Sequence, residues 1–395
     1  MSFNLKKKHP FKRVDQSLQK LLQPEYYDLL IKRVGGEHQI EAFSQNFIPV
    51  LVRWSFEAFF KFCVEQGVFS ALANGGTTKE MLFDLGWKNE AMLQDLLDAL
   101  VDQAILNKKK REYLPLALSK SSNSDFQEIS SKFGLKYLDK DWIKKSAGYR
   151  IIFSFYNKLI SSFLLDSMIT GQPTTSLKGS EPSHLTTIYD SLQFTPTYAI
   201  PRMAAIAFAI SKRNPQTILD LNCSTGRGTE EILRCKSNAE MVIGVDQDPY
   251  QLEIAQRNIE AQHASYDFRE ESTSFRIVDY SKSLTDQLGE FTGSFDMILI
   301  NQLPTWISKE SFSIILPEIW DLLRKDGIIA LYQPLRPSID IPWPDEWLLR
   351  VIDGFNGYPT KSEIIQQFSR RTIKKSPVSV RRQSIVPILA YTFSS

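Results

Sequence analysis

The feature that most constrains the fold is an alternation of short apolar segments with helical ones, which begins at Thr217. The apolar segments are TILDL, MVIGVD, SFRIVD, FDMILIN and GIIALYQ. Apolar runs of this length that alternate with helices are typical of parallel strands joined by crossover helices. The sequence from Thr217 onward therefore predicts an α/β fold with a mostly parallel sheet.

The N-terminal part has a different pattern, because residues 14–118 read almost entirely as helices. One helix is predicted to end near Gly67, from apolar residues at helical spacing: Leu51, Trp54, Ala58, Phe59, Phe62 and Val68. Thr77 or Thr78 can cap a second helix, which stops at Gly86, and Asn89 can cap a third. The segment ILNKKKREYLPL then predicts two short strands around a charged turn. Helix, turn, helix and hairpin is the order of a winged helix.

The length of 395 residues, with 43% hydrophobic and 23% charged residues, is enough for two or three domains. We expect a mainly helical domain containing the winged helix over residues 1–120. A helical linker that contributes to a substrate pocket is expected over 121–215, with its helix at 148–168, and the α/β domain over 216–395.

Charge and residue counts exclude several classes of protein. The net charge is +2, and the three cysteines and four histidines are not paired at ligand spacing, which argues against a metal site. Three cysteines spread widely along the chain suggest a reducing compartment. The basic start MSFNLKKKHPFKR lacks the apolar run of a secretory signal, and the most apolar stretches are too short or carry a charge. We expect a cytoplasmic protein without a membrane span.

The predicted hairpin raises the possibility of DNA binding, because its turn holds Lys108, Lys109, Lys110 and Arg111. The second helix of the pair argues against it. Its sequence NEAMLQDLLDALVDQ carries Glu90, Asp95, Asp98 and Asp102 and no basic residue, so it would repel phosphate.

The segment TILDLNCSTGRGTEEIL carries the sharpest sign of a ligand site. A buried strand ends at Asp220, a turn of small residues follows, and a helix begins near Thr229. Small residues allow the backbone to approach a ligand closely. The next strand ends at Asp246, 26 residues further on, where an acid can accept both hydroxyls of a ribose. Later strands end at Asp279, which could accept from an adenine amine, and at Asn301.

These segments resemble the class I S-adenosylmethionine-dependent methyltransferases. The motifs that carry the resemblance are the loop DLNCSTG, the acidic motif GVDQDP, the acid of VDY and the strand FDMILIN. The resemblance covers residues 217 to about 335 well, and KKSPVSVRRQSIVPILAYTF fits the closing antiparallel strand pair of the family. It implies a Rossmann-like, mostly parallel seven-stranded sheet and S-adenosylmethionine as the cofactor.

The resemblance also implies roles for individual residues. Four positions of the first loop would cradle the methionine part of the cofactor: Asp220, Asn222, Ser224 and Gly226. Asp246 would hold the ribose with Gln247 beside it, Asp279 and Tyr280 would bracket the adenine, and Asn301 would contribute a backbone contact. Asn222 departs from the family, which has a glycine there. Because asparagine tolerates positive φ, the loop can keep its shape.

The N-terminal half resembles the small-molecule O-methyltransferases that dimerise through a winged-helix domain. The resemblance implies a homodimer. Those enzymes have a Leu-His-x-Trp pattern after the fourth strand, and its histidine removes the proton of the substrate hydroxyl. Here NQLPTWISKE keeps Leu303 and Trp306 but has Pro304 at the histidine position. The base could be His184 or Tyr189, the acceptor could be an amine, thiolate or stabilised carbon that needs no base, or alignment alone could suffice.

The leading hypothesis is a dimeric methyltransferase of a small aromatic or polyketide-like secondary metabolite. A nicotinamide-dependent enzyme is disfavoured, because the loop NCSTGRG lacks the third glycine in G-x-G-x-x-G phase. Two alternatives remain open. One is a regulator that binds DNA through the winged helix and binds S-adenosylmethionine as a signal. The other, suggested by Asn222 and Pro304, is a protein that binds the cofactor without turnover.

Overall fold

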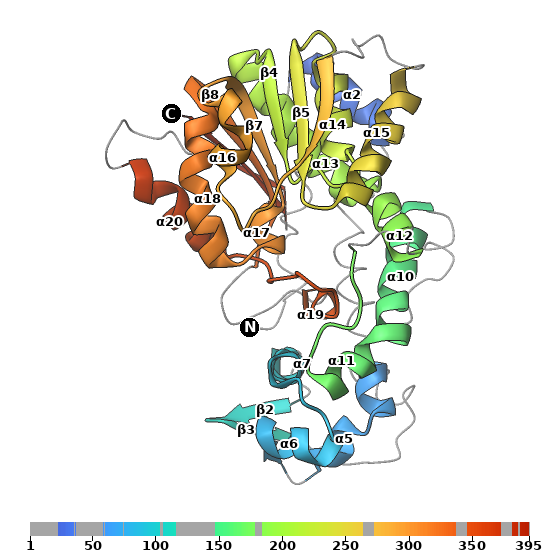
Figure 1. Ribbon diagram of the computed structural model, residues 1–395. Coiled ribbons are helices and arrows are strands. Elements are labelled where there is room, and N and C mark those ends of the chain that lie inside the picture. The colour runs from blue at the N-terminus through green and yellow to red at the C-terminus, as the bar shows by residue number, and fades with distance from the viewer. Residues whose placement is uncertain are drawn as a thin grey trace. The chain divides into compact units, whose positions relative to one another are not determined.

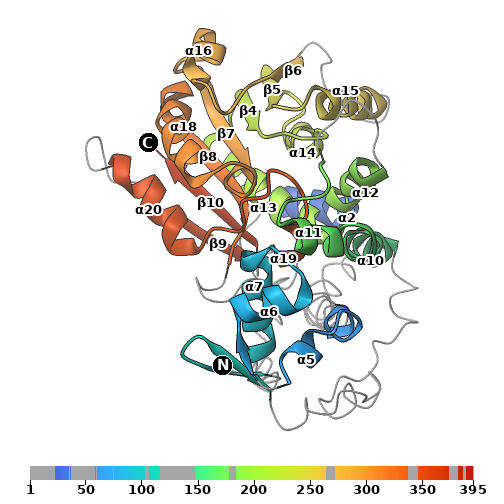
Figure 2. The same cartoon turned by 60° about the horizontal axis from the view of Figure 1, so that its bottom comes forward.

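The chain forms two compact units in the computed structural model (Figures 1 and 2). The structure describes residues 23–34, 36, 58, 60–73, 75–102, 106–115, 147–177, 184–263, 272–336, 346–372, 381–385 and 388–394. Among these, the first unit takes residues within Gln45–Ser176 and Pro337–Gly357. The second takes those within Phe11–Ser44, Leu177–Arg336 and Tyr358–Ser395. The three-part division at residues 120 and 215 stays a prediction.

The first unit contains the helix, helix and hairpin that the sequence predicts. Its first elements are α5 (Val68–Ala71), β1 (Gly76–Thr77), α6 (Thr78–Leu85), α7 (Glu90–Asp102), β2 (Leu106–Lys109) and β3 (Glu112–Pro115). The strands make a small antiparallel sheet in the order β1-β3-β2. The hairpin of β2 and β3 is thus joined by β1, a strand that precedes α6 and α7.

The helix boundaries in this unit follow the predicted capping residues. The Thr77 side chain accepts from the Glu80 backbone N–H while the Glu80 side chain accepts from Thr77, which makes a capping box. Gly86 ends α6 with a φ of 68°, and the Asn89 side chain accepts from the Met92 N–H at 3.1 Å. The caps predicted at Thr77, Gly86 and Asn89 are therefore confirmed. Residues 51–57 of the helix predicted before Gly67 lie outside the described residues.

The rest of the first unit comes from two distant parts of the chain. The helical stretch predicted at 148–168 is α10 (Ala147–Leu159), a π-helical turn (Ile160–Leu164) and α11 (Leu165–Thr170). The short α19 (Glu346–Leu349) also belongs to this unit. Arg350 pairs with Asp95 at 2.9 Å, and Trp347 packs against Phe62. Residues after the fifth predicted strand therefore complete the core of the first unit.

The second unit is built on a seven-stranded sheet. Its strands are β4 (Thr217–Leu221), β5 (Met241–Asp246), β6 (Thr273–Ile277), β7 (Phe295–Asn301), β8 (Leu323–Pro334), β9 (Arg381–Ile385) and β10 (Ile388–Ser394), in the order β6-β5-β4-β7-β8-β10-β9. The five strands from β6 to β8 are parallel, and β10 runs antiparallel to both β8 and β9. The predicted Rossmann-like arrangement of parallel strands and crossover helices is confirmed.

Helices pack on this sheet because its central strands are apolar on both faces. The helices are α2 (Pro24–Val34), α12 (His184–Gln193), α13 (Pro196–Arg213), α14 (Arg227–Cys235), α15 (Pro249–His263), α16 (Leu284–Leu288), α17 (Leu303–Trp306), α18 (Lys309–Leu322) and α20 (Lys361–Thr372). Every residue of β4 after Thr217 is buried, as are the last five residues of β7. Strands buried on both faces are expected where helices cover a parallel sheet. None of the described helices is long and apolar enough to cross a membrane.

Strand order fixes where a ligand would bind. The chain runs from β4 outward to β5 and β6, and then returns to β7 on the other side of β4. In open parallel sheets, the crevice beyond the carboxyl ends of the strands opens where the strand order reverses. Here that point lies between β4 and β7.

Candidate functional site

The site is built on three neighbouring strand ends. Asp220 is the penultimate residue of β4, Asp246 is the last residue of β5, and Asn301 is the last residue of β7. Because these strands are parallel and adjacent, their carboxyl ends share one edge of the sheet. The predicted strand end at Asp279 differs slightly, since β6 ends at Ile277.

The loop after β4 is shaped by residues with left-handed backbone. Asn222 has a φ of 64°, Ser224 of 52° and Gly226 of 78°. The Asn222 side-chain amide donates to the Asn301 carbonyl at 2.7 Å, and this bond fixes the loop across the point between β4 and β7. A Cβ on Gly226 would lie 2.8 Å from the Cβ of Ala255, so the loop packs too tightly for a larger residue there. Asparagine at position 222 thus keeps the positive φ expected of it.

Asp246 joins this loop to the end of β5. Its carboxylate accepts from the Ser224 N–H at 2.9 Å and from the Asp248 N–H at 3.0 Å, and Gln247 contributes a further backbone N–H. Burial raises the pKa of Asp246 to about 6 despite these bonds. Since each carboxylate oxygen can accept more than one hydrogen bond, Asp246 keeps acceptor capacity for a ligand.

Asp220 lies deeper in the sheet. It is completely buried, and the Thr229 hydroxyl donates to one of its oxygens at 2.8 Å. Burial raises the pKa of Asp220 to about 7, and the nearby Asp246 adds to that rise. A Cβ on Gly228 would lie 2.7 Å from the same carboxylate, so a glycine is needed for α14 to approach it.

At or directly after the ends of β4, β5 and β7, three buried carboxylate or amide oxygens have no hydrogen-bond partner among the described residues. They are Oδ1 of Asp220, Oδ2 of Asp248 and Oδ1 of Asn301. Buried polar atoms in folded proteins nearly always have a partner. Three such atoms on adjacent strand ends therefore indicate a ligand that supplies several N–H or O–H donors.

The acid and aromatic residue after β6 have separate environments. The Asp279 carboxylate accepts from the Ser281 hydroxyl at 2.6 Å and its N–H at 3.0 Å, and it pairs with Lys282 at 3.0 Å. These bonds lower the pKa of Asp279 to about 2. Tyr280 is buried, and its hydroxyl donates to the Val245 carbonyl at 3.4 Å. The structure thus places Asp279 at the surface and Tyr280 beneath the end of β5.

The short helix after β7 carries the Pro304 position. Pro304 lies in the first turn of α17, and Gln302 before it has a φ of 55°. Trp306 contacts Tyr189 of α12 edge to face, with ring centroids 6.2 Å apart. Burial raises the pKa of Tyr189 above its ordinary value, so its phenol stays protonated. His184 is the first residue of α12, and its side chain lies outside the described part.

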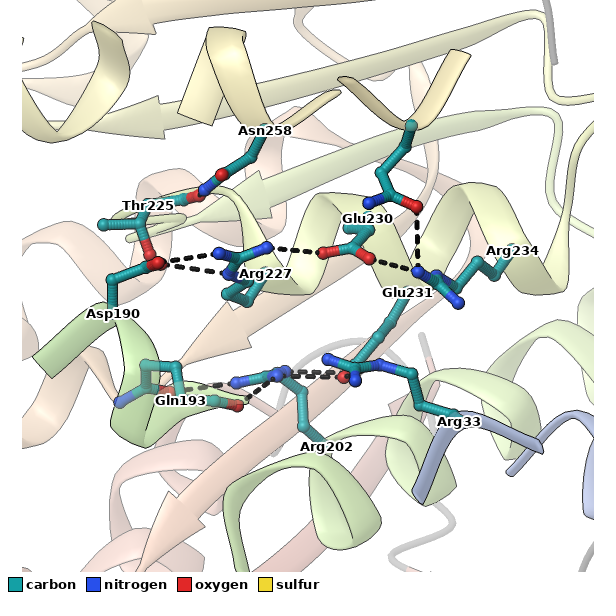
Figure 3. Close-up of polar contacts among 11 residues, drawn as sticks. Arg33, Asp190, Gln193, Arg202, Thr225, Arg227, Glu230, Glu231, Arg234 and Asn258 are labelled. Atoms are coloured by element: carbon teal, nitrogen blue, oxygen red, sulfur yellow. Dashed lines mark hydrogen bonds and ion pairs between the residues drawn. The ribbon is translucent and has the colours of Figure 1, made fainter. Parts of the chain in front are cut away.

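An ion-pair network behind the loop was not anticipated from the sequence. Arg227 pairs with Asp190 at 2.6 Å and with Glu230 at 3.0 Å (Figure 3). Arg202 and Glu231 form a second pair at 2.7 Å, with both side chains completely buried. The sequence signal for this network was the presence of charged residues in these helices, which by itself does not reveal the partners. Among the residues that the structure describes, no His, Cys, Asp and Glu cluster could hold a metal ion.

Comparison with known proteins agrees with this geometry. Residues 218–327 match the family model described as "Methyltransferase domain". A 114-residue stretch is 32% identical to the ribosomal protein L11 methyltransferase of Thermosipho africanus. That match covers 29% of this chain and 36% of the relative, so the chain spans about a third of that protein's length.

Solved structures match over nearly the whole chain. The DszA carbon methyltransferase matches with a TM-score of 0.66 and 13% identity, covering 97% of this chain and 96% of that one. The citrinin polyketide synthase CMeT domain matches with a TM-score of 0.65 and 12% identity, covering 97% of each chain. The CurJ carbon methyltransferase matches with a TM-score of 0.62 and 14% identity, covering 96% and 98%. At these identities the likeness shows the fold.

A Rossmann-like sheet whose switch point carries a left-handed loop and buried carboxylates is the arrangement in which open α/β sheets bind nucleoside cofactors. Residues 218–327 thus form a methyltransferase domain, and the resemblance to the class I S-adenosylmethionine-dependent methyltransferases, a family whose cofactor is S-adenosylmethionine, is confirmed.

Proposed function

We propose that this protein binds S-adenosylmethionine at the carboxyl edge of β4, β5 and β7 and methylates a small-molecule acceptor. The observation that carries the proposal is the set of buried acceptor oxygens on Asp220, Asp248 and Asn301, which have no partner in the described part of the chain. S-Adenosylmethionine has the complementary donors, an ammonium group and two ribose hydroxyls. When bound, it supplies a methyl group on a positively charged sulfur, which is a strong electrophile.

The residues of the first loop suit the methionine part of the cofactor. Asp220 and Asn301 offer free side-chain oxygens to an ammonium group, and Asn222 holds the loop in place by its bond to Asn301. The positive φ values at Ser224 and Gly226 turn the loop around the end of β4. A buried carboxylate near a cation is stabilised by their mutual attraction, which offsets the burial of Asp220.

The ribose and adenine fit the next two strand ends. Asp246 keeps acceptor capacity for the ribose hydroxyls, with Gln247 directly after it. Tyr280 supplies an apolar ring beside the end of β5. An adenine amine that used the Asp279 carboxylate would compete with Lys282 for it. The backbone after β6 is therefore a second place for the adenine contact.

We further propose a stabilised carbon acid, polyketide-like in chemistry, as the acceptor. Pro304 has no titratable atom, so no base stands at the position where a hydroxyl acceptor would need one. A carbon beside carbonyl groups ionises more readily than an aliphatic hydroxyl. The carbon methyltransferases and the polyketide synthase domain similar in fold to this chain support that choice. Of the two candidate bases, Tyr189 stays protonated because burial raises its pKa, and His184 is needed only if the acceptor does not ionise unaided.

The helices α6 and α7 with the hairpin β2–β3 are proposed to form a winged helix that pairs two copies of the chain. DNA binding through it is the weaker alternative. Lys108 on the hairpin pairs with Asp98 of α7 at 2.6 Å, so one of the hairpin's four basic residues is neutralised within the unit. The acidic residues of α7 would also face phosphate unfavourably.

Calorimetry with the natural cofactor and its demethylated product tests the proposal. S-Adenosylmethionine and S-adenosylhomocysteine should both bind, and Asp246→Asn should weaken both by about ten-fold or more, because hydrogen bonds to a charged group contribute roughly 1.5–3 kcal/mol. Glu240→Gln is the matched control, since it removes one acidic charge next to the opposite end of β5. Unchanged affinity in Asp246→Asn would remove Asp246 from the site. Cofactor binding without methyl transfer to 1,3-dicarbonyl acceptors would favour the non-catalytic alternative.

A further inference from the structure

Arg227 links α12 to the end of the loop from Asn222 to Gly226, which we call the cofactor loop. It is the first residue of α14 and directly follows Gly226. Its guanidinium group donates to both carboxylate oxygens of Asp190, at 2.9 and 2.6 Å (Figure 3). The two side chains are only 10% and 17% exposed, so water screens the pair weakly. A bidentate pair of this kind fixes orientation as well as distance.

A second connection starts inside the loop. The Ser224 hydroxyl donates to the Gln251 side chain, and the Gln251 amide donates to the Leu177 carbonyl at 3.3 Å. Thr186 of α12 donates to the same carbonyl at 3.3 Å. The loop from Asn222 to Gly226 is therefore held against the region of α12 at two separate points.

The same helix reaches the other side of the site. Tyr189 precedes Asp190 in α12 and contacts Trp306, which ends the short helix after β7. Adjacent residues of α12 therefore contact the exit of the cofactor loop and the segment that follows β7. A displacement of α12 would therefore alter both contacts.

The end of α12 is anchored more rigidly than its middle. Gln193 accepts from Arg202 at 2.9 Å, and Arg202 pairs with Glu231, both with completely buried side chains. Phe194 stacks between the guanidinium groups of Arg33 and Arg227, at 3.8 and 4.2 Å from the ring centroid. The partly exposed pair of Asp190 and Arg227 is the contact that a ligand in the loop can influence.

We propose that Asp190 and Arg227 are positioning residues, which hold the cofactor loop in its binding shape and link cofactor binding to the contact between Tyr189 and Trp306. The inference rests on the proposed function. A loop held in place before the ligand arrives loses less conformational freedom on binding, so the pair strengthens cofactor affinity without touching the cofactor. Its loss should weaken binding and disturb Trp306.

A double-mutant cycle tests this role. Calorimetry with S-adenosylmethionine should show about ten-fold weaker binding in Asp190→Asn and in Arg227→Gln, and the double variant should bind no more weakly than either single variant. Arg227→Lys keeps the charge but loses the two-pronged geometry, and should show an intermediate loss. Glu253→Gln is the control, because it breaks the exposed pair with Arg257 on α15 and should leave affinity unchanged.

Tryptophan fluorescence separates positioning from simple stabilisation. The part of the fluorescence change on cofactor binding that is lost in Trp306→Phe is assigned to Trp306. At saturating cofactor, this part should also be smaller in Asp190→Asn than in wild type. Fully additive losses in the cycle would overturn this inference and leave the proposed function standing. Wild-type affinity in folded Asp190→Asn and Arg227→Lys, with only a lower unfolding midpoint, would do the same. If the wild-type protein binds neither S-adenosylmethionine nor S-adenosylhomocysteine, the proposed function fails as well.

Discussion

The side-chain amide of Asn222 donates to the backbone carbonyl of Asn301 at 2.7 Å and so joins the carboxyl ends of β4 and β7. The bond lies at the point where the strand order reverses, which is where ligands bind in sheets of this type. A glycine at position 222 would give the same backbone shape without the bond. The asparagine therefore adds a fixed link to the loop.

Substitutions at Asn222 should separate backbone shape from side-chain bonding. Asn222→Gly keeps the positive φ and loses one hydrogen bond, so it should lower the free energy of unfolding by about 0.5–1.5 kcal/mol. Asn222→Ala adds the strain of left-handed backbone, roughly 1–2 kcal/mol more. Urea unfolding of the three proteins measures both. Equal stability of the two variants would show that backbone strain at this residue is negligible.

Asp220 should make the stability of the ligand-free protein depend on pH. Burial raises its pKa to about 7, so the folded state binds this proton more tightly than the unfolded chain, whose aspartates have a pKa of about 3.9. The contribution of Asp220 to stability therefore falls as pH rises from about 4 to about 7, by no more than about 4 kcal/mol.

The difference in urea unfolding between wild type and Asp220→Asn isolates this contribution, since other acids titrate in both proteins. The variant should gain relative stability as pH rises through this range. Binding of the positively charged cofactor should strengthen over the same range in wild type, because it favours the ionised carboxylate. A difference that does not vary with pH would contradict the raised pKa.

Gly228→Ala should damage the site although alanine usually favours a helix. The new Cβ would lie 2.7 Å from an Asp220 oxygen, so either α14 or the carboxylate must move. We expect a loss of at least about ten-fold in cofactor affinity, equivalent to about 1.4 kcal/mol. Gly289→Ala is the matched control, because nothing lies within 4 Å of its new Cβ and its φ of −62° suits alanine. Calorimetry on both variants checks the comparison.

Turnover should depend little on His184 if the acceptor is a carbon acid with readily ionised protons. His184→Ala would then change the methyl-transfer rate by less than about ten-fold, and Pro304→His should add nothing. A hydroxyl acceptor that uses His184 as its base would instead lose about a hundred-fold with unchanged cofactor affinity. Rates with a radiolabelled methyl donor and paired carbon and hydroxyl acceptors distinguish the two cases.

The protein should form a homodimer through its N-terminal part, as its winged-helix resemblance implies. Light scattering of the full chain at micromolar concentration measures the mass directly. A variant that deletes the first 120 residues is not a fair test, because α2 packs within the second unit, where Arg33 contacts Glu231 at 3.7 Å. A monomeric full chain would contradict the prediction.

The sequence predicts the parallel strands well because each reads as an apolar run that ends in a polar residue. Asp246 and Asn301 both end their strands as expected, and Asp220 lies one residue from the end of β4. The capping roles of Thr77 and Asn89 could also be predicted from the sequence, because a cap depends only on neighbouring residues. Local rules therefore carry most of the fold.

The ion pairs could not be read from the sequence, because they join residues distant along the chain. Asp190 and Arg227 lie 37 residues apart. Their charges resemble those of any exposed helix until the positions of α12 and α14 on α13 are known. The surroundings of Asp279 depend instead on local backbone geometry, because its bonds to Ser281 and Lys282 form within the turn after β6.

The order in which the chain visits its two units has a consequence for its synthesis. The polypeptide contributes α2 to the second unit, then α5 to α11 to the first, then β4 to β8 to the second, and α19 to the first again. The last strand, β10, lies between β8 and β9 rather than at the edge of the sheet. A nascent chain on the ribosome therefore cannot finish either unit until most of its length has emerged. Early termination after residue 327, where the family match ends, should yield an unfolded product that cellular proteases remove.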